Sequence, residues 1–147
     1  MKIAIGSDHG GYALKKEVEK HLEEQGYLFE DFGCHSTESC DYPAFAEAVG
    51  KAVTTGGFDL GLLFCGTGIG ISIAANKVPG VRAACCSDSF SAKYTRMHND
   101  ANILCMGGRV VGPGLACELV DLFLTTPFEG GRHRRRVDQI TAIENAR

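Results

Sequence analysis

Cys65 ends a run of apolar residues and is followed at once by a glycine-rich turn. Residues 60–64 read LGLLF, and the turn reads CGTGIG. This pattern predicts a buried strand, a tight turn and then a helix over residues 71–77. Backbone N–H groups at such a turn can face an anion, and they favour a thiolate over a thiol. We therefore predict a reactive cysteine beside an anion-binding loop; the alternative is that Cys65 only fills the strand end.

Several known loop motifs do not fit this turn. A dinucleotide-binding loop needs G-x-G-x-x-G after the first strand, whereas these glycines alternate and follow the third strand. A Walker loop ends in Gly-Lys-Ser/Thr, which is missing. A cysteine phosphatase loop carries an arginine at the position that Ile71 occupies. A cysteine-dependent hydrolase or amidase remains open, because Cys65 and His98 could form a thiolate–imidazole pair.

Two further groups of polar residues are candidates for a site. The first is SDHGG, with Asp8 and His9, and the second is MHNDAN, with His98 and Asn99. A capping Asp8 with a surface His9 explains the first group as well as a binding site does. A cation and a cap at a helix end explain the second group equally well.

A cluster of arginines, RHRRR, lies at residues 132–136 of a chain whose net charge is −3. Arg132 and Arg136 are four residues apart and share one face of the predicted helix. Two guanidinium groups on one face suit a phosphate group. A solvent-exposed helix start is the alternative, although cations oppose the helix dipole there. No aromatic residues alternate with the arginines and no second basic patch occurs, so nucleic acid is not an expected partner.

Strand and helix patterns alternate along the chain. Strands are predicted over 2–8, 27–33, 60–64, 81–87 and 101–107, and helices over 11–25, 42–57, 71–77, 89–99, 112–126 and about 131–146. The alternation predicts a single α/β domain, 1–147, in which a five-stranded parallel sheet is covered on both faces by helices. This is a three-layer, Rossmann-like α/β/α sandwich. Sites in such sheets lie at the carboxyl ends of the strands. We therefore expect one site built from the ends of strands one, three and five, together with His98 and Asn99.

Composition narrows the functional classes. The 147 residues include 15 basic and 18 acidic residues, and 44% are apolar. Neither a nucleic-acid nor a membrane role is suggested, and no apolar run suits a membrane span or a signal peptide. The simplest expectation is a cytoplasmic protein.

The seven cysteines show no C-x-x-C pair, so a thioredoxin motif or a zinc ribbon is not expected. Four of them lie in apolar segments: Cys85, Cys86, Cys105 and Cys117. We predict that these four are small core residues, because free cysteine is commonly buried. Unpaired thiols of this kind suit a reducing compartment.

Seven segments, in order, resemble the type B ribose-5-phosphate isomerases, a group that also includes galactose-6-phosphate and allose-6-phosphate isomerases. They are GSDHGG (6–11), DFG (31–33), DYP (41–43), CGTGIGISIAANK (65–77), HNDANIL (98–104), GGRVVG (107–112) and GGRHRRRV (130–137). The resemblance implies an aldose–ketose isomerase that needs no metal and no cofactor. It also implies a homodimer or a dimer of dimers, with sites shared between subunits and the C-terminal helix in the dimer contacts.

The resemblance assigns roles to individual residues. Cys65 would be the general base, since Ile71 stands where another branch of the family has a glutamate base. Thr67 would help to move protons at the sugar oxygens. Backbone N–H groups of the loop would stabilise the oxyanion and bind substrate, at Gly66, Thr67, Gly68, Ile69 and Gly70. His98 would open the sugar ring.

The remaining roles concern binding. Asp8, His9 and Asn99 would bind the sugar or its phosphate, and Arg109, Arg132 and Arg136 would hold the phosphate. One subunit would supply the base, Arg132 and Arg136, and its partner would supply His98, Asn99 and Arg109. Ribose 5-phosphate is the favoured substrate, with allose 6-phosphate second and galactose 6-phosphate also open. A sensor that binds a phosphosugar without turnover is the alternative that is not an enzyme.

Overall fold

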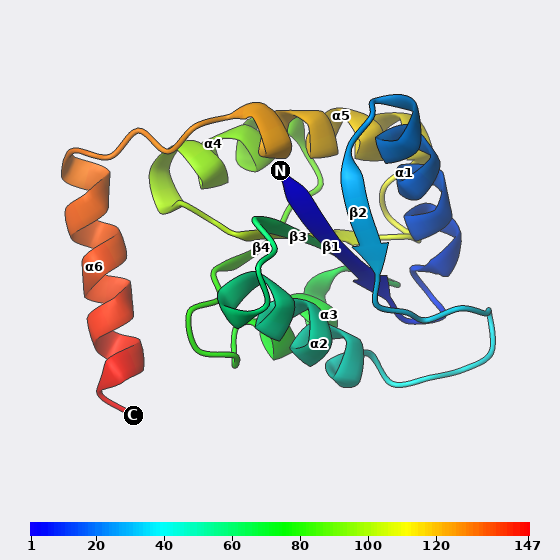
Figure 1. Ribbon diagram of the computed structural model, residues 1–147, viewed down its shortest axis with the longest axis horizontal. Coiled ribbons are helices and arrows are strands. Elements are labelled where there is room, and N and C mark those ends of the chain that lie inside the picture. The colour runs from blue at the N-terminus through cyan, green and yellow to red at the C-terminus, as the bar shows by residue number, and fades with distance from the viewer.

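The computed structural model describes residues 1–147, and its five strands form one sheet between layers of helices (Figure 1). The strands are β1 (Lys2–Ser7), β2 (Leu28–Asp31), β3 (Leu60–Cys65), β4 (Ala83–Cys85) and β5 (Ile103–Gly107). The helices are α1 (Tyr12–Glu24), α2 (Tyr42–Thr55), α3 (Ile69–Ala75), α4 (Ser89–Asn99), α5 (Pro113–Thr125) and α6 (Arg132–Asn145). The predicted α/β fold and the order of its elements are confirmed. Helix α3 begins two residues earlier than predicted, and the edge strands are shorter.

The strand order is β2-β1-β3-β5-β4, and all neighbouring strands are parallel. The three central strands are almost completely buried. Helices cover both faces of the sheet as predicted, but the edge strands are more exposed than the central ones: Leu28 of β2 is 70% exposed and Cys85 of β4 is exposed. An edge strand has a neighbouring strand on one side only.

Two apolar cores lie on opposite faces of the sheet. Helices α1, α4 and α5 contribute to one core, and α2 and α3 contribute to the other. Side chains alternate between the faces along a strand. Leu62 and Phe64 of β3 therefore join the first core, whereas Leu63 and Cys65 join the second. The side chain of Cys65 thus lies on the α2–α3 side of the sheet.

The seven cysteines are all free. Cys86 and Cys105 are buried as predicted, and burial raises the pKa of Cys86 to about 11 and that of Cys105 well above its usual range. The prediction is wrong for Cys85, which ends an edge strand and is exposed, and for Cys117, which is half-buried. Cys117 lies outside the buried face of α5, which Ala116, Leu119, Val120, Phe123 and Leu124 form.

Helix α6 stands beside the β4 end of the sheet and packs on α4 (orange to red in Figure 1). Only His133 and Val137 of this helix are buried. Its arginines at the start and two isoleucines further on, Ile140 and Ile143, are exposed. None of the six helices has the length and apolar character that crossing a membrane requires.

Candidate active site

Three loops meet at the carboxyl edge of the sheet, where the loops after β1, β3 and β5 are joined by backbone hydrogen bonds. The Asp8 N–H donates to the carbonyl of Phe64 at 3.1 Å, and the Gly108 N–H donates to the carbonyl of Cys65 at 2.8 Å. These strands are neighbours in the sheet, so their ends are adjacent. The rule that sites lie at the carboxyl ends of parallel strands is the reason that these loops were expected to contribute to one site.

Cys65 lies at the centre of these loops. Its Sγ accepts a hydrogen bond from the Gly68 N–H at 3.1 Å, and the residue is 4% exposed. A peptide N–H that points at sulfur stabilises negative charge on it. No histidine nitrogen lies within hydrogen-bond distance of this Sγ, so one chain does not form the thiolate–imidazole pair of a cysteine hydrolase.

Gly68 has a backbone that another residue would not adopt easily. Its φ is +79°, and a Cβ on it would lie 2.7 Å from the carbonyl carbon of Met106 and 3.0 Å from the nitrogen of Gly107. Both neighbours are backbone atoms of β5, and they cannot move without disturbing the sheet. Glycine at this position lets the loop turn towards Cys65.

The change Gly68→Ala is expected to lower the free energy of unfolding by about 1–3 kcal/mol from backbone strain, with the clash adding to this loss. Gly114→Ala is the matched control, because a Cβ there meets nothing within 4 Å and alanine favours the helix. Urea unfolding of both variants measures the difference. Equal stability of the two variants would contradict a steric need for glycine at 68.

Asp8 and His9 lie at the same edge. Asp8 is 6% exposed, and its Oδ1 accepts a hydrogen bond from the Gly11 N–H at 3.1 Å, just before α1. The capping interpretation of Asp8 is wrong, because the N-cap of α1 is Gly11 and no side chain caps this helix; Asp8 instead fixes the turn before it. The Nδ1 of His9 lies 3.2 Å from the backbone of Cys40 and ties the first loop to the segment after β2.

Thr67 projects into solvent beside a cavity of about 210 Å³. Its Oγ1 accepts a hydrogen bond from the Ile69 N–H at 3.2 Å. The cavity is lined by Thr67, Ile69, Cys85, Cys86, Ser87, Gly107, Val110 and Val111. An exposed hydroxyl next to a hollow of this size is accessible to a small molecule.

Arg109 and Tyr42 lie against the glycine loop. A Cβ on Gly66 would lie 2.9 Å from Nη1 of Arg109, and a Cβ on Gly70 would lie 2.7 Å from the ring of Tyr42. Arg109 was expected to come from the partner of the subunit that carries Cys65, but it lies beside the loop of its own chain. No role was predicted for Tyr42; its only signal was the DYP segment, residues 41–43.

His98 and Asn99 do not lie at this edge. Helix α4 follows β4 and runs antiparallel to the strands, so its last residues lie at their amino ends. Arg82, directly before β4, confirms this, because its Nε donates to the carbonyls of Asn99 and Asp100 at 3.2 and 3.0 Å. The expectation from the strand-end rule, that Cys65 and His98 meet at one edge of the sheet, is therefore wrong within a single chain, whereas the expected division of the two residues between subunits does not require them to meet there. The rule that sites lie at the carboxyl ends of parallel strands applies to the loops that follow strands, whereas His98 lies at the end of a helix.

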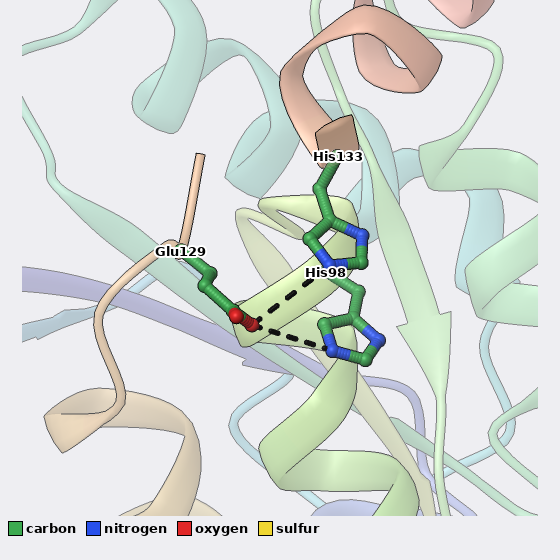
Figure 2. A group of neighbouring side chains, drawn as sticks. All are labelled: His98, Glu129 and His133. Carbon is green, nitrogen blue, oxygen red and sulfur yellow. Dashed lines mark ion pairs between the residues drawn. The ribbon is translucent and has the colours of Figure 1, made fainter. Parts of the chain in front are cut away.

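Helix α6 brings further polar residues to His98. The rings of His98 and His133 stack with their centroids 4.0 Å apart and their planes 7° from parallel. The Oε2 of Glu129 lies 3.5 Å from Nε2 of His98 and 3.8 Å from Nε2 of His133 (Figure 2). Glu129 and His133 were not predicted as site residues, although both lie in the EGGRH stretch before the other arginines.

The candidate site residues therefore form two groups in one chain. The loop group consists of Asp8, His9, Tyr42, Cys65, Gly66, Thr67, Gly68, Ile69, Gly70 and Arg109. The α4–α6 group consists of His98, Asn99, Glu129, Arg132, His133 and Arg136. Arg132 and Arg136 are exposed at the start of α6, which packs on α4, so they accompany His98 rather than Cys65.

Comparisons with known proteins give one consistent result. The family model described as Ribose/Galactose Isomerase matches residues 3–140. Ribose-5-phosphate isomerase B of Escherichia coli K12 is 53% identical over 146 residues, which cover 99% of this chain and 98% of that protein. A match of this extent includes both groups of site residues.

Solved structures agree with the sequence comparisons. Ribose-5-phosphate isomerase B of Clostridium thermocellum is 56% identical, with a TM-score of 0.98 and 99% of each chain covered. The Mycoplasma genitalium enzyme, solved with bound ribulose 5-phosphate, is 42% identical, with a TM-score of 0.92 and 98% of this chain and 96% of that one covered. The chain described here therefore belongs to the ribose/galactose isomerase family.

Proposed function

We propose that this protein interconverts ribose 5-phosphate and ribulose 5-phosphate, with Cys65 as the general base. The observation that carries the proposal is the match over almost the whole chain to ribose-5-phosphate isomerases B, one of them solved with ribulose 5-phosphate. The contact from the Gly68 N–H to Sγ of Cys65 supports the role of the thiol.

The reaction passes through an enediolate. The thiolate of Cys65 takes the proton from C2 of the open-chain aldose, and the proton returns to C1. Thr67, whose hydroxyl is exposed beside the loop, moves a proton between the sugar oxygens. The backbone N–H groups of residues 66–70 stabilise the oxyanion, since fixed dipoles need no reorganisation as the charge develops. The loop thus holds Sγ of Cys65 and receives the charge that the proton transfer creates.

A complete site requires two chains in this proposal. Within one chain the loop group lies at the carboxyl edge of the sheet, and the α4–α6 group contains the end of α4 at the opposite edge. A dimer with twofold symmetry joins the loop group of one subunit to the α4–α6 group of its partner, and it forms two such sites. His98 opens the sugar ring there. Arg132 and Arg136 come from the subunit that supplies His98, because α6 packs on α4, and this proposal differs from the expected division.

Phosphate binding anchors the sugar at a distance from the reacting carbons. Arg136→Ala is expected to weaken binding of ribose 5-phosphate by about 1.5–3 kcal/mol, the range for a hydrogen bond to a charged group. Binding of unphosphorylated ribose should change little. Arg135→Ala is the matched control, since Arg135 is an equally exposed arginine on another face of α6. Calorimetric titration with both sugars measures the effect, and equal losses for both would make Arg136 a structural residue.

The substrate can be identified with a panel of sugar phosphates. Ribose 5-phosphate, allose 6-phosphate and galactose 6-phosphate are compared at equal concentration, with ketose formation as the readout. Ribose 5-phosphate is expected to have the highest kcat/KM. Stoichiometric binding without turnover would instead favour the phosphosugar sensor. If the protein hydrolyses an ester or an amide, and replacement of Cys65 abolishes this activity, the alternative of a cysteine-dependent hydrolase is favoured.

A further inference from the structure

The imidazole of His98 contacts two aromatic rings. The ring of Tyr94, one turn earlier on α4, meets it edge to face with centroids 4.9 Å apart and planes at 76°. His133 from α6 covers a face of the same ring at 4.0 Å. The His98 side chain nevertheless keeps 34% of its surface exposed, whereas that of His133 keeps 7%. His98 is thus oriented by its neighbours and is still accessible to a ligand.

One use for two histidines and a carboxylate is to bind a divalent metal. The ligand atoms of His98, Glu129 and His133 all lie within 4.8 Å of one another. A zinc ion needs imidazole lone pairs that converge on one point about 2.0–2.1 Å from each nitrogen. Parallel rings stacked face to face do not converge in this way, because an ion between the two Nε2 atoms would lie well outside both ring planes. The geometry therefore does not favour a metal site.

The buried ring of His133 is suited to stacking rather than to proton transfer. Its Nε2 is buried without a hydrogen-bond partner, and the carboxylate of Glu129 lies 3.8 Å away. Burial lowers the pKa of His133, and the nearby His98 and Arg132 lower it further. A neutral imidazole can lie against His98 without charge repulsion.

Glu129 is closer to His98, with 3.5 Å between its Oε2 and Nε2. This is an ion-pair distance rather than a hydrogen bond, and the negative charge of the carboxylate attracts a proton to the nitrogen that faces it. The second nitrogen of His98, Nδ1, lies on the side of the ring away from Glu129 (Figure 2). In the neutral ring it then carries the free lone pair.

We propose that His133 and Glu129 are positioning residues for His98: the stack sets the plane of its ring, and the carboxylate keeps a proton on Nε2 so that Nδ1 is the reactive nitrogen. This inference rests on the proposed role of His98 in ring opening. There Nδ1 takes the proton of the C1 hydroxyl, the bond from C1 to the ring oxygen breaks, and the same proton passes to that oxygen. After the step, His98 carries the same proton as before it.

Kinetics test the role of the stack. His133→Ala is expected to lower kcat for ribose 5-phosphate about 10- to 100-fold, since misplacing a reacting group by 1 Å can cost that much. His133→Phe keeps a flat ring and should restore most of the loss. Turnover of ribulose 5-phosphate, which forms no normal furanose ring, should fall less than that of ribose 5-phosphate. His21→Ala is the control, because His21 contacts the carboxylate of Asp121 at 2.7 Å between α1 and α5, away from this group.

A double-mutant cycle separates positioning from general stability. If His133 acts through His98, then adding His133→Ala to His98→Asn should cause no further loss of kcat. An additional 10-fold loss in the His98→Asn protein would overturn the proposal. Unfolding curves for each variant show whether it is folded under the conditions in which kcat is measured.

Nitrogen-15 spectra of the histidine rings test the proton position without any turnover. His98 is expected to show the tautomer with the proton on Nε2, and Glu129→Ala should shift it towards a mixture of both tautomers. Glu129→Gln keeps the shape of the side chain and removes its charge, so it should give an intermediate result. An unchanged tautomer in both variants would overturn the role of Glu129. Failure of isomerase activity with the expected tautomers would instead count against the proposed function alone.

Discussion

Replacing Cys65 with alanine is expected to slow exchange of the C2 proton of ribose 5-phosphate with solvent by about 10²- to 10⁴-fold, the usual contribution of a general base. Binding should remain nearly intact, because the arginines and the backbone N–H groups that hold the substrate are unchanged. The loss is large because no other side chain replaces the thiol: Ile71 is apolar, and no histidine nitrogen lies within hydrogen-bond distance of Sγ. Proton exchange in deuterated water, followed by NMR, measures the rate directly.

The controls for this result are replacement of other cysteines, protection by substrate and treatment with a metal chelator. Cys117→Ala changes a half-buried thiol on α5 and should have no effect on exchange. Iodoacetamide should inactivate the enzyme and substrate should protect it. This test is best made in a Cys85→Ala background, since Cys85 is exposed and lines the cavity beside Thr67. EDTA should not change the rate. Exchange at a near-normal rate in Cys65→Ala would remove Cys65 as the base.

Two inactive variants should restore activity to each other if the site is shared between subunits. Cys65→Ala disables the loop group and His98→Ala disables the α4–α6 group. In a mixed dimer, one site carries both changes and the other carries neither. Random pairing makes half of the dimers mixed, so about a quarter of all sites are intact. Unfolding the two variants together and refolding them should return activity to about that fraction of the unmodified enzyme.

The outcome depends on the opposite positions of the two groups in one chain. The contacts of Arg82 place the end of α4 at the amino edge of the sheet, while Cys65 lies at the carboxyl edge. Each variant refolded alone is the matched control for the mixture. If mass spectrometry shows mixed dimers but activity stays at the level of the separate variants, Cys65 and His98 act in the same subunit. The proposal that the site is shared between subunits is then wrong.

The elements of the fold, and all of the loop group except Tyr42, were predicted from the sequence. Hydrophobic periodicity is a local property, and it places each side chain on a face of its own helix or strand. Leu14, Val18 and Leu22, four residues apart, are buried along α1 as that pattern indicates. Cys65 was identified in the same way, because a strand, a glycine turn and a helix are consecutive in the chain.

The order of the strands, and the place of Glu129 and His133 in the α4–α6 group, were decided only by the tertiary structure. Periodicity does not report which strand becomes an edge, so the exposure of Cys85 was missed. Nor does it report at which edge of the sheet a helix ends, so the strand-end rule grouped His98 with Cys65, and only the family resemblance assigned the two residues to different subunits. His98 and His133 are 35 positions apart in the chain and come together only because α6 packs on α4. Contacts of this kind depend on how whole elements bury their apolar surfaces against one another, and no short stretch of sequence contains that information.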